Sequence, residues 1–342
     1  MSLTSLTAAD VAAVPEPVVA ILRGTRHALT VCHENPEADA LGSALAHALL
    51  VEALGGQATP VCVDPVPAMY DFMPGLARFR QAPDPAIPYD LIVVGDCGEL
   101  ARVGGLLRDH AELFGRVPIL DIDHHKSNPG FGAVDWIDPL AAATCEMSTL
   151  LAARLGVPLE AAGGQLASCL VAGLVIDTAT FQHPNTTPRT LRVAAELVAA
   201  GGPLYATSRA IYRTKPNRQL HLFGVVLARL ETALEGRLVW SRLEEADLLA
   251  TGATAADAEG LIDLLGQSAS GQIVILFKEA GAETRLSIRT HDGGVDATRL
   301  AGRWGGGGHA RAAGATVPAP LTEATWLVLP VAEQLLAEHP AG

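Results

Sequence analysis

The sequence has few aromatic residues, fewer basic than acidic residues, and no long apolar run. Aromatic residues make up 4% and hydrophobic residues 49% of the 342 residues, so we expect a large core of Ala, Val and Leu and exclude intrinsic disorder. The 24 basic against 37 acidic residues give a net charge of −13, which argues against a broad basic face for duplex DNA. No run of about 18 uncharged apolar residues occurs, so no membrane span is expected.

The cysteines are also few, and none belongs to a CxxC pair. The five are Cys32, Cys62, Cys97, Cys145 and Cys169. Most lie in apolar runs, so we expect small buried side chains in a reducing compartment. The N-terminal residues lack a basic region followed by an apolar stretch, so no signal peptide is expected. These features predict a cytoplasmic protein.

Strand and helix signals alternate in the first half of the chain. Short apolar runs predict buried strands at residues 28–32, 91–95 and 117–122. Periodicity predicts helices at residues 39–54, 140–155 and 160–176. The alternation predicts an α/β fold with a parallel sheet and helices on both faces. Ligands of such sheets bind beyond the carboxyl ends of the strands.

The pattern changes in the second half. Helices are predicted at residues 191–200 and 219–234, and the most basic stretch of the chain, residues 208–218, lies between them. Strands are then predicted at residues 238–240, 273–277 and 284–288, and a closing helix at 322–337. We therefore predict a first domain at residues 1–190, a helical connector at 191–236, and a smaller α/β domain at 237–342. The active site is expected in the cleft between the two domains.

Polar clusters follow the apolar runs of the first domain. In chain order, these clusters contain His33, Glu37 and Asp39, then Asp96, then Asp123, His124 and His125, and finally Asp177. If the strands are parallel neighbours, the clusters meet at one edge of the sheet. Crowded carboxylates raise one another's pKa, and divalent cations remove that conflict. These ligands are too many for one ion with an open position, so we predict two ions that share a carboxylate, an arrangement that hydrolyses phosphate esters.

At these residues the sequence resembles a known family. The elements His33-x-x-x-Glu37-x-Asp39, Asp96, Asp123-His124-His125 and Asp177 resemble the four motifs of the DHH phosphoesterases. The run from Gly305 to Gly314, GGGGHARAAG, is similar to the glycine-rich signature of the DHH-associated C-terminal domain. The two-domain length resembles the bacterial oligoribonuclease branch, the nanoRNases, whose members often also remove the 3′-phosphate of 3′-phosphoadenosine 5′-phosphate.

The resemblance implies two Mn²⁺ ions, with Mg²⁺ or another divalent metal as the alternative. It implies that one ion is held by His33, Glu37 and Asp96. The second ion would be held by Asp39, Asp96, His124 and Asp177, with Asp96 bridging. His125 would face the substrate phosphate, and Asp123 would orient a neighbouring imidazole. The family usually has Asp in place of Glu37, and the extra methylene moves the carboxylate by about 1.5 Å, so we expect an altered metal preference.

The resemblance also implies substrate contacts in the second domain. The residues concerned are Arg289, Gly306, Gly307, Gly308 and His309. The glycines would let backbone N–H groups approach a phosphate, and a helix expected after them would add its positive end. The alternatives are a mobile turn for the glycines and a strand-end ion pair for Arg289.

The resemblance implies a metal-dependent phosphodiesterase that hydrolyses very short single-stranded RNA or DNA to mononucleotides. Alternatives are a pyrophosphatase or polyphosphatase of the same superfamily, and a non-catalytic nucleotide-binding module. No membrane is expected as a partner. A long duplex nucleic acid is not expected either, because each phosphate contact with a long strand needs its own cation. The oligomeric state stays open, with a homodimer as one alternative.

Overall fold

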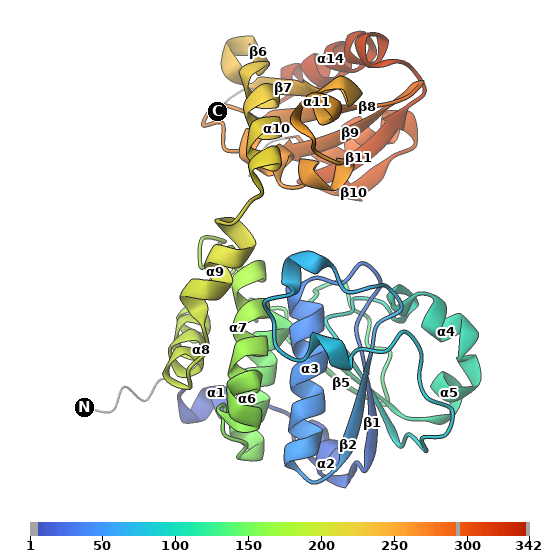
Figure 1. Ribbon diagram of the computed structural model, residues 1–342, viewed down its shortest axis with the longest axis vertical. Helices are drawn as coiled ribbons and strands as arrows, with labels where there is room; N and C mark the ends of the chain where they lie inside the picture. Colours follow the sequence, from blue (N-terminus) through green and yellow to red (C-terminus); the bar gives the residue numbers. More distant parts are fainter. Residues whose placement is uncertain (1–5, 292–294, 340–342) are drawn as a thin grey trace. The chain divides into compact units, whose positions relative to one another are not determined.

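The computed structural model describes residues 6–291 and 295–339 (Figure 1). These residues form two compact units, Met1–Thr214 and Lys215–Gly342. Residues 191–214, which we placed in a connector, therefore lie in the first unit. The rest of that segment, residues 215–236, belongs to the second unit.

A five-stranded sheet forms the centre of the first unit. Its strands are β1 (His27–Val31), β2 (Gln57–Val61), β3 (Leu91–Gly95), β4 (Ile119–Asp123) and β5 (Val134–Ile137). They are all parallel, in the order β2-β1-β3-β4-β5. The three predicted strands occupy the centre of the sheet, and the two edge strands, β2 and β5, were not predicted.

Helices cover both faces of this sheet, as predicted (Figure 1). The larger core lies on one face, against α2 (Glu16–Gly24), α3 (Ala38–Ala53), α6 (Thr144–Leu155) and α7 (Gln165–Asp177). On the other face lie α4 (Gly105–Asp109) and α5 (Ala111–Arg116). Three further helices complete the unit, namely α1 (Ala8–Ala12), α8 (Pro188–Ala199) and α9 (Leu204–Tyr212). The mixed α/β prediction is confirmed.

A six-stranded sheet forms the second unit. In chain order the strands are β6 (Glu231–Ala233), β7 (Leu238–Leu243), β8 (Ile273–Ala280), β9 (Glu283–Thr290), β10 (Gly307–His309) and β11 (Ala312–Val317). Their spatial order is β10-β11-β9-β8-β7-β6. One core contains residues of α13 (Ala297–Ala301) and α14 (Leu321–Ala337). A second core contains residues of α10 (Asn217–Ala228) and α12 (Leu261–Leu265), and α11 (Glu245–Thr251) packs beside α10.

The closing helix predicted at residues 322–337 is present as α14, but it does not follow the glycine run directly. The run instead enters strand β10, which turns back into β11. Gly308 has a φ of +140°, and a Cβ there would lie 2.4 Å from the carbonyl oxygen of Ala312. A Cβ at Gly306 would lie 2.2 Å from the carbonyl oxygen of Gly314. Glycine is thus required at these two positions by the closeness of the two strands.

No helix within residues 6–291 and 295–339 has the length and apolar character needed to cross a bilayer.

Candidate metal centre

The site begins where three neighbouring strands of the parallel sheet end. His33 follows β1, Asp96 follows β3, and His124 follows β4. The order of strands reverses between β1 and β3, because β2 lies on one side of β1 and β3 on the other. This reversal point is where open parallel sheets bind ligands beyond their carboxyl ends.

Two helices bring further carboxylates to these strand ends. Glu37 is the N-cap residue of α3, and Asp39 lies in the first turn of that helix. Asp177 is the last residue of α7, so the apolar run that it ends is a helix. The predicted ligands therefore come from strand ends and from helix termini alike.

The structure brings the predicted ligands together in two groups that share one residue. One group is His33, Glu37 and Asp96. The other group is Asp39, Asp96, His124 and Asp177. In each group, one ligand atom per residue lies within 4.8 Å of all the others. Asp96 belongs to both, which is the geometry that a bridging carboxylate needs.

Asp96 is at the centre of the site. Its carboxylate lies 3.8 Å from His33 Nε2 and 3.4 Å from His124 Nε2, and its side chain is 1% exposed. Burial alone raises the pKa of Asp96, but interactions with His124 and His33 outweigh burial and lower it below its usual range. The backbone at Asp96 has a φ of +57°, a strained conformation of the kind found at functional sites.

Asp39 is fully buried and is held by the start of α6. Its two carboxylate oxygens accept hydrogen bonds from the backbone N–H groups of Thr144, at 2.7 Å, and Cys145, at 2.9 Å. Burial, together with repulsion from Asp96, raises the pKa of Asp39 to about 7. Thr144 also points its hydroxyl at Asp96, 3.4 Å away. We did not predict a role for Thr144, because this contact joins residues far apart in the sequence.

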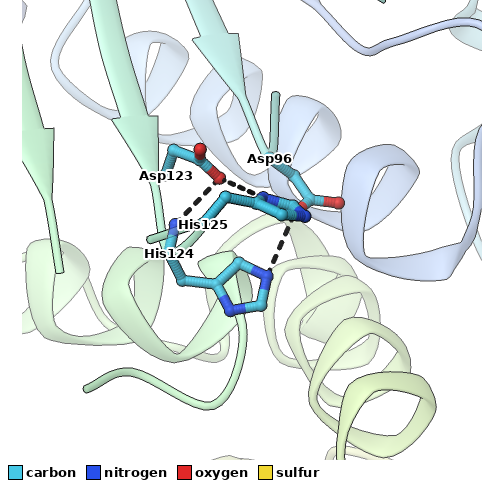
Figure 2. A group of neighbouring side chains, drawn as sticks. All are labelled: Asp96, Asp123, His124 and His125. Atoms are coloured by element: carbon cyan, nitrogen blue, oxygen red, sulfur yellow. Dashed lines mark hydrogen bonds and ion pairs between the residues drawn. The ribbon is translucent and has the colours of Figure 1, made fainter. Parts of the chain in front are cut away.

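The side chains of Asp123, His124 and His125 make different contacts (Figure 2). His124 Nε2 lies 3.3 Å from Asp177 and points into the ligand group. His125 Nδ1 lies 2.7 Å from Asp123 Oδ1, and the His125 side chain is 36% exposed. The Asp123 carboxylate also accepts the backbone N–H of His124 at 2.8 Å. Asp123 thus holds both histidines while it remains buried.

Asn128 is a second residue that sequence reasoning missed. Its Nδ2 lies 2.8 Å from Asp123 Oδ2 and 3.0 Å from Asp121 Oδ2. Its Oδ1 accepts the N–H of Gly130. Burial raises the pKa of Asp121 to about 7. The amide therefore joins two buried carboxyl groups, one of which, Asp123, also contacts His125.

The residues fit a divalent metal. Among the described residues, Asp96 Oδ2 is a buried carboxylate oxygen that has no hydrogen-bond partner. Burying such an oxygen without a partner is costly, and a bound cation would remove the cost. The surrounding donors are imidazole nitrogens and carboxylate oxygens, a set that Mn²⁺, Fe²⁺ and Zn²⁺ accept.

The predicted contacts of the second unit lie on and beside its sheet. Arg289 donates from Nε to Asp263 Oδ1 at 2.8 Å, so the ion-pair alternative for this residue is present. Residues Gly307, Gly308 and His309 are exposed in β10. Gly306 donates its N–H to Ala301.

A parallel sheet that gathers carboxylates and imidazoles at its reversal point is typical of metal-dependent enzymes that hydrolyse phosphate esters. Residues 27–174 match the family model described as DHH family, N-terminal domain, and residues 238–338 match the DHHA1 domain. The chain belongs to the DHH family, and the predicted enzyme class, a hydrolase acting on phosphate ester bonds, is confirmed.

Two relatives and one solved structure illustrate the similarity. The bifunctional oligoribonuclease and PAP phosphatase NrnA of Thermus thermophilus is 34% identical over 83% of this chain and 82% of its own length. The protein of the same name from Bacillus subtilis is 28% identical over 66% of this chain and 70% of its own. An exopolyphosphatase-related protein from Bacteroides fragilis has the same fold, with a TM-score of 0.83, 21% identity and 98% of each chain covered.

Proposed function

We propose that this chain hydrolyses very short oligonucleotides to mononucleotides and removes a phosphate from 3′-phosphoadenosine 5′-phosphate. The observation that carries the proposal is the pair of ligand groups sharing Asp96. The substrate class in this proposal is taken from the names of the Thermus and Bacillus relatives. Short single strands of RNA or DNA are the proposed substrates, and the acidic net charge of −13 opposes binding of a long strand.

Two Mn²⁺ ions are the proposed cofactors. His33, Glu37 and Asp96 would hold one, and Asp39, Asp96, His124 and Asp177 the other. Bound divalent ions make water more acidic and offset the charge that develops on a phosphoryl group. Glu37 is the most exposed of these ligands. Its longer side chain would alter the affinity and the metal preference of the ion that it holds.

The proposed catalytic residues are His125 and Asp123. His125 is the more exposed of the two site histidines that follow β4, and a phosphate can therefore reach its imidazole. Asp123 accepts a hydrogen bond from Nδ1 of that ring, which leaves Nε2 for the substrate. Asp123 also favours the protonated ring, because its carboxylate raises the pKa of His125. A cationic His125 stabilises the negative charge of the phosphoryl oxygens.

The proposed substrate contacts of the second unit are Arg289, Gly306, Gly307, Gly308 and His309. Arg289 presents a planar guanidinium, which suits bidentate contact with a phosphate. His309 and its two preceding glycines are exposed along β10. In the described structure, Arg289 already pairs with Asp263, so a phosphate must compete with that carboxylate.

A product time course tests the function. Labelled RNA and DNA of two to seven residues would be incubated with Mn²⁺, beside 3′-phosphoadenosine 5′-phosphate and pyrophosphate. We expect mononucleotides from the shortest strands and adenosine monophosphate from the bisphosphate. Release of phosphate from pyrophosphate alone would instead support the pyrophosphatase, and binding without any product would support a non-catalytic module.

A further inference from the structure

His47 is a fully buried histidine that the proposed mechanism does not use. It lies on α3, about two turns of helix after Asp39, and its side chain is 0% exposed. Burial lowers the pKa of His47 to about 4, so its ring is neutral at physiological pH. Buried polar side chains are placed by the hydrogen bonds that they make, and the contacts of this ring lead to the metal centre.

The hydrogen bonds around His47 fix which ring nitrogen carries the proton. His47 Nε2 lies 2.9 Å from Ser148 Oγ on α6. The Ser148 hydroxyl donates its one hydrogen to the carbonyl oxygen of Thr144, at 3.0 Å. The hydroxyl oxygen therefore accepts a hydrogen bond from His47, and the neutral ring carries its proton on Nε2. Since His47 Nδ1 has no hydrogen-bond partner among the described residues, the contact with Ser148 is the one that orients the ring.

Thr144, the first residue of α6, contacts two of the proposed metal ligands. Its N–H donates to Asp39 at 2.7 Å, and its hydroxyl lies 3.4 Å from Asp96 Oδ1. The hydrogen bond from the Ser148 hydroxyl to the Thr144 carbonyl, one turn back along the helix, adds a constraint to the first turn of α6. Ser148 therefore connects His47 to the residue that holds both carboxylates.

A packing contact connects His47 to the same site by a second route. Gly95 is the last residue of β3 and directly precedes Asp96. A Cβ on Gly95 would lie 3.1 Å from His47 Cε1, so the ring packs against the backbone that leads into Asp96. The φ of +57° at Asp96 is a strained conformation, and such strain persists only where the surrounding structure fixes it.

We propose that His47 is a positioning residue of the metal centre, which acts through the hydroxyl of Ser148 and the first turn of α6. The groups that it positions are the carboxylates of Asp39 and Asp96. The inference rests on the proposed function, because it concerns the ligands of that same site. Neither His47 nor Ser148 belongs to a ligand group, so loss of their hydrogen bond should loosen the site without removing a ligand. Losses of this kind typically change metal affinity or activity by about 10–100-fold.

Two substitutions at position 47 separate the hydrogen bond from the packing. His47→Leu keeps an apolar side chain in the core and removes the donor, whereas His47→Gln keeps an N–H donor at a similar reach. Titration calorimetry of the full chain with Mn²⁺, without substrate, measures the apparent Kd of the metal. We expect the Kd to rise about tenfold or more in His47→Leu and to stay within about threefold of the parent value in His47→Gln.

Ser148→Ala removes the connection itself. It should weaken Mn²⁺ binding as much as His47→Leu does, and the double variant should bind no more weakly than either single variant, because both changes break one connection. Ser168→Ala on α7 is the matched control. The Ser168 hydroxyl also bonds a carbonyl one turn back, that of Gly164, but at the opposite end of α7 from Asp177. Its Kd for Mn²⁺ should equal that of the parent.

A merely structural role for His47 would lower the unfolding temperature of the metal-free protein and leave the Kd for Mn²⁺ unchanged in the folded variants, which would overturn the proposal. Equal weakening in His47→Leu and His47→Gln would also overturn it, because the hydrogen bond would then not be the cause. If neither variant folds, an unchanged Kd in Ser148→Ala overturns it instead.

These outcomes are separate from those that test the proposed function. Mn²⁺-dependent turnover by the parent, with an unchanged Kd in the variants, would refute the role of His47 alone. Weakened Mn²⁺ binding in His47→Leu and Ser148→Ala, rescued in His47→Gln, would support the positioning role even if the parent hydrolysed none of the proposed nucleotides, and only the proposed hydrolase would then be refuted.

Discussion

At the scale of single residues, Asp39 offers the sharpest test of the metal centre. Asp39 is buried among carboxylates, and burial together with repulsion from Asp96 raises its pKa. Asp39→Ala removes a ligand of the proposed second ion. We expect hydrolysis of a dinucleotide with Mn²⁺ to fall about a thousandfold or more. A variant that kept the full rate would refute the assigned ligand group.

Asn128 gives a second prediction at this scale. Asn128→Ala removes the amide that joins Asp121 and Asp123, and Asp123 then loses one of the contacts that fix its position behind His125. We expect kcat to fall about 10–100-fold while KM changes little. The measurement is a pH–rate profile of both proteins. A purely structural role would lower the unfolding temperature and leave kcat of the folded protein unchanged at every pH.

At the scale of elements, an ion pair joins two helices far apart in the sequence. Arg192 of α8 donates two hydrogen bonds to Asp10 of α1, at 3.0 and 2.9 Å. This pairing lowers the pKa of Asp10 from 3.8 to about 2. A carboxyl group with a depressed folded pKa stabilises the protein above its unfolded pKa, and the stabilisation is lost as the pH falls toward the folded pKa.

Asp10→Asn should therefore lower the free energy of unfolding of the first unit at pH 7 by about 1–2 kcal/mol. This value is smaller than the pKa shift alone implies, because the Arg192 side chain is 33% exposed and solvent screens the ion pair. The difference in free energy of unfolding between the variant and the parent protein should become smaller below pH 4. Urea unfolding at pH 7 and near pH 3.5 measures both quantities. A gap that widened on acidification would contradict the assigned ion pair.

The elements that could be predicted are those whose own residues carry the signal. Strand β3 is a five-residue apolar run, and its bounds were predicted as found. Strand β2 contains Gln57 and Pro60 and is half exposed at the edge of the sheet, so it has no buried-strand pattern. The roles of Thr144 and Asn128 could not be predicted, because they depend on tertiary contacts. Thr144, for example, binds a carboxylate 105 residues away.

At the scale of the whole molecule, each unit has a core of its own, and the proposed metal ligands all belong to the first. The first unit has cores on both faces of its parallel sheet. The second unit has separate cores on the two faces of its own sheet. Units with independent cores can unfold separately, and a ligand stabilises the unit that binds it.

Scanning calorimetry of the full chain should therefore resolve two transitions, of which Mn²⁺ moves only one. At about one hundred times its Kd, Mn²⁺ adds about 2.7 kcal/mol to the first unit, which raises the Tm of a unit of this size by roughly 5–10 °C. A chelator should reverse the shift. Asp39→Ala serves as the control, since a weakened ligand group should reduce the shift and leave the second transition in place. A shift of both transitions by the same amount would show that the metal site or the cooperativity extends beyond the first unit.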